Sequence, residues 1–180
     1  MLYNKRKIAN KEVPSDFIYF WKPSQQYGEF SQWYMSPFTD GTRTYCCAEQ
    51  YMMTQKAILM GDTDVLEKIM STTSPKDMKA LGRQVRNFDE NIWNEEKYNI
   101  VLRASLLKFS QNKTLKEMLY STGTKVLVEA SPYDAVWGIS MDAKTAYTTQ
   151  VHSWRGENLL GFALMEARST LRALETREHQ

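Results

Sequence analysis

Cysteine, histidine and long hydrophobic runs are scarce in this chain of 180 residues. The two cysteines, Cys46 and Cys47, are adjacent, so they cannot form the loop-closing disulfide framework of a small secreted protein. The two histidines, His152 and His179, do not have the spacing of a metal site, and a Ser-His-Asp triad would rest on His152 alone. We therefore expect a reducing compartment, no structural metal and no triad chemistry.

Other signatures are missing as well. No apolar run approaches the ~20 residues that span a bilayer, and residues 1–16 are polar and basic, without the apolar stretch of a secretory signal. The sequence contains neither a Gly-x-Gly-x-x-Gly loop nor a Gly-Lys-Ser/Thr phosphate loop, and its formal charge of +2 is too small to mark a dedicated nucleic-acid binder. These absences predict a cytoplasmic protein with no membrane partner and no cofactor.

The residue patterns predict one mainly helical domain, because a chain of this length can bury a single core. Residues 1–16 are expected to form a flexible basic tail, and residues 17–177 the folded domain. Apolar and alternating runs predict strands at 17–21, 43–46 and 125–130; helical spacing and capping residues predict helices at 48–60, 64–70, 74–82, 90–110, 113–120 and 157–177. Residues 131–153 are expected to be irregular, and the fold class is α+β with a small β-sheet.

The last predicted helix has an apolar stripe that should face the core. The stripe consists of Leu160, Leu164, Ala167, Leu171 and Leu174. Arg168, Arg172 and Glu175 are expected to face solvent.

Two charges stand out in the helix predicted at 48–60, which is otherwise nearly uncharged. Glu49 and Lys56 are seven residues apart, so they share one helix face at a separation of roughly 10 Å along the axis. One interpretation is that both line a pocket, since an unpartnered buried charge is costly. The other is that Glu49 only stabilises the helix start and that Lys56 reaches water. The pattern alone leaves both open.

Several sequence blocks, in one order, resemble the NADAR (NAD- and ADP-ribose-associated) family of YbiA-like N-glycosidases over residues 17 to about 174. The blocks are Phe17 to Trp21, Tyr27 to Trp33, Ala48 to Tyr51, Gln55 to Ala57, Leu81 to Arg83, Trp93, Lys108-Phe109, Leu127 to Glu129, Asp134 to Gly138 and Gly156 to Gly161. The resemblance implies cleavage of a bond between ribose and a base, with an ADP-ribosyl or ribosyl nucleotide as substrate.

The resemblance also implies roles for individual residues. Glu49 would be the essential carboxylate, with Lys56 as the second catalytic candidate. The implied substrate-binding residues are Tyr27, Phe30, Ser31, Arg83, Trp93, Asp134, Trp137, Gly138 and Asn158. Structural alternatives remain for three of them: Tyr27 in packing, Arg83 at a helix end and Asp134 in a turn.

Three positions depart from the family pattern. Gln32 and Gln50 stand where Asn and His are common, and Ile139 stands where the bacterial riboflavin-pathway member has an acid. The last departure favours ADP-ribose attached to guanine as substrate over ribosylated intermediates of riboflavin biosynthesis, although Asp142 lies near enough in sequence to supply a carboxylate.

Two mechanisms remain open at this stage. Glu49 could activate water or stabilise positive charge at the anomeric carbon. Alternatively, Lys56 could attack that carbon in the ring-opened sugar and form a Schiff base. A binding module for ADP-ribose or NAD without turnover is the non-enzymatic alternative, and ADP-ribosylated DNA or RNA is a further candidate partner.

Overall fold

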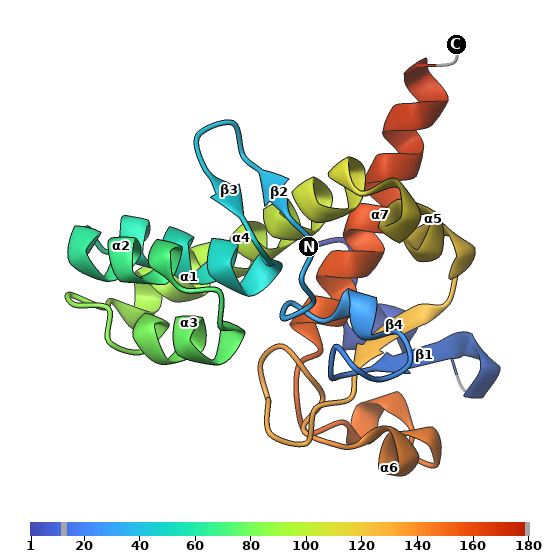
Figure 1. Cartoon of the computed structure of the whole chain (residues 1–180). Helices are drawn as coiled ribbons and strands as arrows, with labels where there is room; N and C mark the ends of the chain where they lie inside the picture. The colour runs from blue at the N-terminus through green and yellow to red at the C-terminus, as the bar shows by residue number, and fades with distance from the viewer. Residues whose placement is uncertain (12–13, 179–180) are drawn as a thin grey trace. The chain divides into compact units, whose positions relative to one another are not determined.

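The computed structural model describes residues 1–11 and 14–178. Helices dominate the chain and the strands are short (Figure 1), which confirms the mainly helical α+β class expected from the sequence. The chain divides into two compact units: unit 1 comprises residues 1–31 and 113–180, and unit 2 comprises residues 32–112. Within the described ranges, no helix is both long and apolar enough to cross a bilayer.

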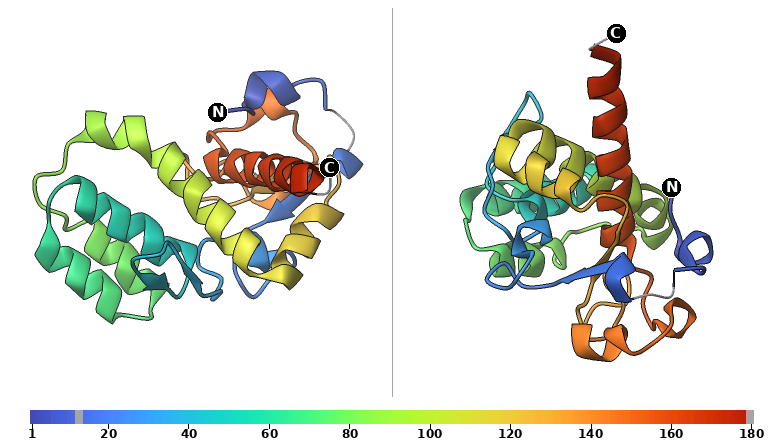
Figure 2. Two further views of the ribbon diagram at one scale, coloured as in Figure 1. Left: turned by 90° about the horizontal axis from the view of Figure 1, so that it is seen from above. Right: turned by 90° about the vertical axis from the view of Figure 1, so that its right-hand side faces the viewer.

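Unit 1 is organised around a two-stranded parallel sheet. The strands are β1 (Phe17–Phe20) and β4 (Val126–Glu129), and both match predicted strands. Helix α7 (Leu159–Glu178) packs against β4; Figure 1 shows it in red and the left panel of Figure 2 views it nearly along its axis. A Cβ at Gly161 would lie 2.1 Å from the carbonyl oxygen of Leu127, so glycine allows this close approach of helix to strand.

The other elements of unit 1 are short. They are η1 (Lys5–Ile8), η2 (Pro14–Asp16), η3 (Gly28–Phe30), α5 (Lys113–Ser121), α6 (Ala143–Tyr147) and η4 (Val151–Ser153). The expectation of irregular chain over 131–153 is wrong at α6 and η4. Helix α6 begins where Asp142 accepts hydrogen bonds from the backbone nitrogen and hydroxyl of Thr145. A helix of this length is too short to show apolar periodicity, which is why the sequence pattern missed it.

The N-terminal segment lies against other parts of unit 1. Ile8 is buried, the Tyr3 hydroxyl is 2.9 Å from the Ser169 hydroxyl, and the Leu2 amide donates to Glu166. The flexibility of residues 1–16 stays a prediction, and residues 12–13 lie outside the described part of the chain.

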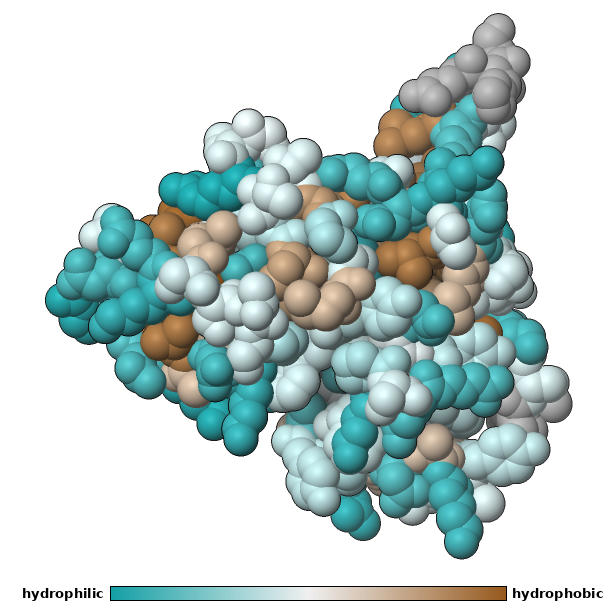
Figure 3. Space-filling model, in the orientation of Figure 1, coloured by the Kyte–Doolittle hydropathy of each residue, from teal (hydrophilic) through white to brown (hydrophobic). Residues whose placement is uncertain are grey.

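Helix α7 confirms the predicted core stripe except at Leu174, and it buries one residue that was expected to face solvent. Leu174 is 49% exposed because the last turns extend beyond the sheet, where Figure 3 shows hydrophobic surface beside the grey terminus. Arg168, expected at the surface, is instead buried, and its guanidinium donates to the Thr122 hydroxyl at 2.6 Å. Burial lowers the pKa of Arg168. The expected solvent position was wrong because residues distant in sequence cover this side of the helix.

Unit 2 is a group of helices with a small hairpin. Its elements are β2 (Phe38–Thr39), β3 (Thr44–Tyr45), α1 (Ala48–Leu59), α2 (Thr63–Ser71), α3 (Pro75–Gly82) and α4 (Glu90–Gln111). Side chains of Asp62, Ser74 and Asp89 cap the helices that follow them by accepting backbone hydrogen bonds. The cap at Ser74 is the one that the sequence analysis used. Helix α1 packs against α2, α3 and α4, so it is the central helix of the unit.

The hairpin and α1 share an aromatic core. Antiparallel pairing joins β2 to β3; β3 overlaps the strand predicted at 43–46, and β2 was not among the predicted strands. The rings of Tyr45 and Tyr51 lie 5.0 Å apart in an edge-to-face arrangement, and Phe38 packs on both. These contacts bury one side of α1 and orient the helix start.

Candidate functional site

Helix α1 carries both predicted catalytic residues. Glu49 lies in its first turn and is only 4% exposed, and its amide donates to the Gln32 carbonyl at 3.0 Å. Cys47 is the residue just before α1; its backbone is extended, and its side chain makes no capping hydrogen bond to the helix. A first-turn carboxylate is favoured by the positive end of the helix dipole. The first turn of α1 therefore places the Glu49 carboxylate beside the positive end of the helix and largely out of water.

Two of the positions that depart from the family pattern flank Glu49. Gln50 is buried: its side-chain oxygen accepts from the Cys46 amide at 2.8 Å, and its nitrogen donates to carbonyls of Ile69 and Thr72 at 3.1 Å. Gln50 thus ties the start of α1 to the end of α2. Gln32 is also buried, and its Nε2 contacts the Met52 sulfur at 3.4 Å. Its Oε1 is buried without a hydrogen bond to the described residues.

An unpaired buried acceptor costs about 1–3 kcal/mol. Gln32 therefore offers a polar atom that a ligand donor could satisfy. The sequence pointed to this position only as a departure from the family pattern, and not as a site residue.

Lys56 lies two turns further along α1, between aromatic rings. Its Nζ donates to the Gly82 carbonyl at 2.7 Å, and it stands 4.4 Å from the centre of the Phe88 ring and 5.5 Å from that of Trp93. Helix α3 comes close enough for this bond because Gly82 has no side chain: a Cβ there would lie 2.0 Å from the Met53 sulfur. We call Lys56, Phe88 and Trp93 the lysine cage.

The surroundings of the lysine cage favour the uncharged form of Lys56. Burial lowers the pKa of Lys56, and the positive charge of Arg83 lowers that pKa further. Neutral lysine is the nucleophilic form, so the change favours a reactive amine. Arg83 itself is exposed at the end of α3. Three predicted residues, Lys56, Arg83 and Trp93, therefore come together in unit 2, whereas the sequence missed Phe88.

Lys108 is a second lysine in unit 2 that the sequence analysis did not assign to the site. It is 2% exposed, and its Nζ lies 5.5 Å from the Tyr34 ring centre and 5.2 Å from that of Phe109. Buried lysines are rare unless they have partners. Its place in one of the family blocks was the signal that could have identified it.

In unit 1, hydrogen bonds between a side chain and the backbone fix the shape of the Asp134–Gly138 loop. The carboxylate of Asp134 accepts from the amides of Val136 and Trp137 at 3.0 and 2.8 Å, which is the turn considered as its structural alternative. Trp137 is largely buried. A Cβ at Gly138 would lie 2.8 Å from the Glu129 carbonyl oxygen, so this loop packs tightly at the end of β4.

Asn158 is fully buried and connects this loop to the sheet. Its side chain accepts from the Glu129 amide and donates to the Leu127 carbonyl, both at 2.9 Å, and its own amide donates to the Gly138 carbonyl at 3.0 Å. Its φ of 58° lies in the left-handed region, which asparagine tolerates better than most residues. These bonds let Asn158 orient the loop, while its contact with substrate stays a prediction.

The remaining predicted residues lie in one turn of unit 1. Tyr27 has a φ of 59°, and its ring stacks parallel to that of Phe30 with 6.0 Å between centres. Phe30 is buried and packs edge-on against Phe20, and Ser31 is buried at the end of the turn. The contacts of Tyr27 and Phe30 are those of packing residues, and their roles in substrate binding stay predictions.

The apolar residue at position 139 is explained by its surroundings. Ile139 is fully buried, and its amide donates to the Glu129 carbonyl at 3.0 Å, so an acid here would be a buried charge. Asp142, the nearby carboxylate, is exposed and caps α6.

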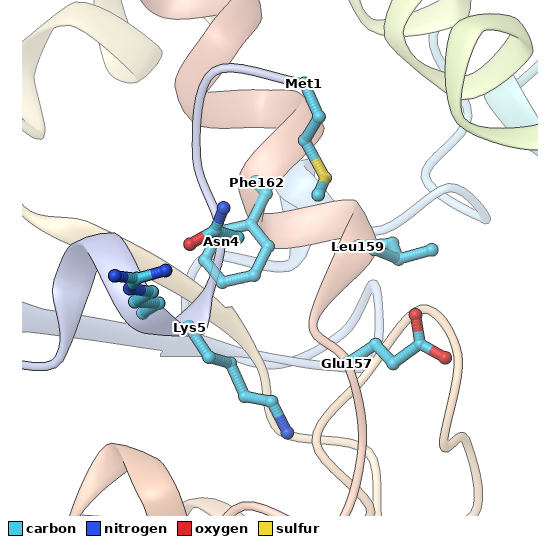
Figure 4. Close-up of a pocket in the computed structure, with 7 residues that line it drawn as sticks. Met1, Asn4, Lys5, Glu157, Leu159 and Phe162 are labelled. Atoms are coloured by element: carbon cyan, nitrogen blue, oxygen red, sulfur yellow. The ribbon is translucent and has the colours of Figure 1, made fainter.

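Other candidate features lie apart from the predicted residues. Figure 4 shows a pocket of about 280 Å³ in unit 1, lined by Met1, Asn4, Lys5, Arg6, Glu157, Leu159 and Phe162. None of the predicted catalytic or substrate-binding residues lines it. Burial raises the pKa of the Cys47 thiol to about 12, which favours its interpretation as a packing residue over that as a nucleophile. In the described ranges, no three potential metal-ligating side chains cluster together.

Comparisons with known proteins agree with this architecture. A family model described as the NADAR domain matches residues 19–172. N-glycosidase R617 of Acanthamoeba polyphaga mimivirus is 44% identical over 144 residues, which cover 77% of this chain and 85% of the relative. N-glycosidase YbiA of Escherichia coli K12 is 30% identical over 154 residues, which cover 86% and 88%. The NMR structure of the E. coli protein YbiA matches with a TM-score of 0.75 and 28% identity, over 100% of this chain and 98% of that chain.

The fold and these matches define an enzyme of the glycosidase class. The chain belongs to the NADAR family, as the sequence blocks indicated.

Proposed function

We propose that this N-glycosidase removes ADP-ribose from ADP-ribosylated guanine, in a nucleoside or in nucleic acid, by using Glu49 and Lys56. The observation that carries the proposal is the condition of Lys56: a half-buried amine between two aromatic rings, with a lowered pKa, on the helix that also holds the buried Glu49. An amine of this kind is suited to covalent catalysis on a sugar aldehyde.

The lysine step begins from the ring-opened sugar, in which the anomeric carbon is joined to the nitrogen of the base as an imine. The neutral amine of Lys56 adds to that carbon, both protons of the amine pass to the base nitrogen, and the base departs as a free amine with the electrons of the broken C–N bond. A lysine imine remains. Water then adds to it, the amine leaves, and the free aldehyde closes to ribose. A carboxylate such as Glu49 can transfer the protons in both halves.

Direct attack by water is the competing mechanism for the same reaction. Glu49 would take a proton from water as the oxygen bonds to the anomeric carbon and the bond to the base breaks, and the same proton would then pass to the nitrogen of the departing base. Lys56 and Arg83 would then hold phosphate or ribose oxygens. Treatment with borohydride during turnover separates the two, because only the lysine imine is reduced to a stable secondary amine on Lys56.

The choice of guanine is supported by Ile139. This buried side chain provides no carboxylate at the position where the riboflavin-pathway member has one. The deciding assay incubates the enzyme separately with ADP-ribosylated guanosine and with a ribosylaminopyrimidine phosphate, and detects the released base. Release from the pyrimidine alone would replace guanine by the riboflavin intermediate, and release from neither would favour a binding module.

Glu49→Gln tests the carboxylate. General acid–base groups contribute roughly 10²–10⁴-fold to rate, so kcat should fall within that range while substrate binding survives. Glu90→Gln is the matched control, because Glu90 also lies in the first turn of a helix of unit 2 but is exposed. Equal rates for the two variants would exclude a catalytic role for Glu49.

A cytoplasmic location belongs to the same proposal. Cys46 and Cys47 are both free, which is compatible with a reducing compartment. Fractionation of cells that express the protein at natural levels tests this location.

A further inference from the structure

Three side chains at one edge of the unit 1 sheet form an exposed cluster of two aromatic rings and one cation. The ring centres of Trp21 and Tyr133 are 5.9 Å apart at 52°, and the Lys22 ammonium stands 4.6 Å above the Trp21 ring. Tyr133 is 87% exposed and Lys22 is exposed as well. We call these residues the aromatic platform. None of them was assigned to the site from the sequence.

The position of the platform follows from strand pairing. Trp21 directly follows β1, and Tyr133 lies four residues beyond β4. Because the strands are parallel, their carboxyl ends meet at the same edge, where the Ala130 amide still donates to the Phe20 carbonyl at 2.8 Å. Ligands of α/β proteins bind beyond the carboxyl ends of parallel strands. Tyr133 also adjoins the predicted substrate-binding loop that begins at Asp134.

A single exposed aromatic side chain needs no special explanation. In the platform, however, a ring that solvent reaches is joined to a second ring and to a lysine. This combination is the one by which proteins bind single strands: bases stack on aromatic faces, and cations attract the phosphates. Alanine substitution of one such aromatic weakens binding roughly 5- to 150-fold, which corresponds to about 1–3 kcal/mol.

That amount is too small to retain a free base, since even a dissociation constant of about 1 mM requires about 4 kcal/mol. An open stacking surface therefore contributes only when its ligand is already held elsewhere, which raises the local concentration of the stacked group. A nucleic-acid strand whose modified base occupies the reaction site meets this condition.

We infer that Trp21, Lys22 and Tyr133 bind an unpaired base, and its phosphate, of a single-stranded nucleic acid that carries the ADP-ribosylated base. The inference rests on the proposed function for the identity of the anchored base. It adds a binding site that distinguishes a strand from a modified mononucleoside.

The first test measures, by anisotropy, binding of a fluorescein-labelled strand of thymidines that carries one ADP-ribosylated guanine. The full chain with Glu49→Gln is the parent in this test, so that the strand is bound but cleaved slowly. Tyr133→Ala should weaken binding by roughly 5- to 150-fold. The matched control is Tyr147→Ala, because Tyr147 is an exposed tyrosine of unit 1 that lies on α6, and its affinity should change less than about twofold. Lys22→Gln should reduce the salt dependence of log Kd by about 0.7, the amount for one phosphate contact to a single strand.

The parent protein should bind duplex DNA of the same length more weakly than the single strand, and a uridine strand distinguishes RNA from DNA. Failure of the parent to bind any strand would overturn the inference and leave a protein partner as the occupant. Equal affinities of Tyr133→Ala and Tyr147→Ala would overturn it too.

The second test compares kcat/KM for an ADP-ribosylated guanine within a strand and within a mononucleoside. The ratio of strand to mononucleoside should fall roughly 5- to 150-fold in Tyr133→Ala, through KM. Equal losses on both substrates would mean that the platform holds a group of ADP-ribose itself, which overturns the inference. If neither substrate is cleaved while the binding result holds, the proposed function fails and the platform stands.

Discussion

Replacement of Lys56 by methionine separates the two mechanisms by the size of the effect. The side chains have similar volume, but methionine has neither a nucleophile nor a charge. Lys56→Met removes the 2.7 Å hydrogen bond to the Gly82 carbonyl and the cation–π interactions with Phe88 and Trp93. Lys68→Met is the matched control, because Lys68 is likewise the basic residue in the last turn of its helix but is exposed.

The effect on stability should be modest. Loss of a partner for the Gly82 carbonyl costs about 1–3 kcal/mol, and each exposed cation–π contact contributes about 0.5–1 kcal/mol. Relief from burying part of a charge acts in the opposite direction, so we expect a net loss of about 1–3 kcal/mol in the free energy of unfolding. A domain with an ordinary stability of about 5–15 kcal/mol stays folded after such a loss. Chemical denaturation measures this quantity for Lys56→Met and Lys68→Met.

The effect on catalysis then distinguishes the roles. If Lys56 only holds a phosphate or ribose oxygen, the variant loses one charge-assisted hydrogen bond of about 1.5–3 kcal/mol, or roughly 10- to 150-fold in kcat/KM. If Lys56 is the nucleophile, kcat should fall by more than about a thousandfold, beyond the reach of one lost contact. Steady-state rates with ADP-ribosylated guanosine decide between them. A decrease below about 150-fold that is confined to KM would refute the Schiff-base step.

Further predictions concern Lys56, Asn158 and Gly161. If neutral Lys56 attacks, log kcat/KM should rise with pH and level off at a pKa below the ordinary 10.5, because the fold favours the uncharged amine. A pH–rate profile measures this rise. The same rise in Lys56→Arg would contradict the assignment to Lys56. Because the pKa of Lys56 is lower in the folded than in the unfolded protein, charged Lys56 destabilises the fold at pH values below the folded-state pKa. This penalty in the free energy of unfolding is relieved as the pH rises towards 10.5. Asn158→Ala should lower the free energy of unfolding by about 2–5 kcal/mol, since two backbone groups of β4 lose their partners. The control is Asn87→Ala, because Asn87 is another residue with left-handed backbone but is exposed; its free energy of unfolding should fall by about 1 kcal/mol. Equal losses in urea unfolding would refute the role of the Asn158 hydrogen bonds. Gly161→Ala should destabilise the protein more than either, because the new Cβ meets a strand carbonyl oxygen at 2.1 Å; an unchanged melting temperature would show that α7 can move away from β4.

Local sequence features predicted the helices of unit 2 well. Helical spacing and the cap at Ser74, which acts on an amide only three residues away, are visible without knowledge of the fold. The short helix α6 and strand β2 were missed because a few residues cannot display a period. Family blocks led to Glu49 and Lys56, but the spacing alone did not decide between a pocket and a helix cap.

The sequence by itself determined the longer helices, the α+β class and the family, because periodicity, capping and ordered motifs are properties of neighbouring residues. Tertiary structure decided the surroundings of individual side chains. Phe88 stands over Lys56, and Tyr133 stands beside Trp21, across separations of 32 and 112 residues that no local pattern encodes. Arg168 is buried for the same reason, since Thr122 reaches it from another helix end. Burial and partners set the charge and reactivity of a side chain, and both arise only when distant segments pack together.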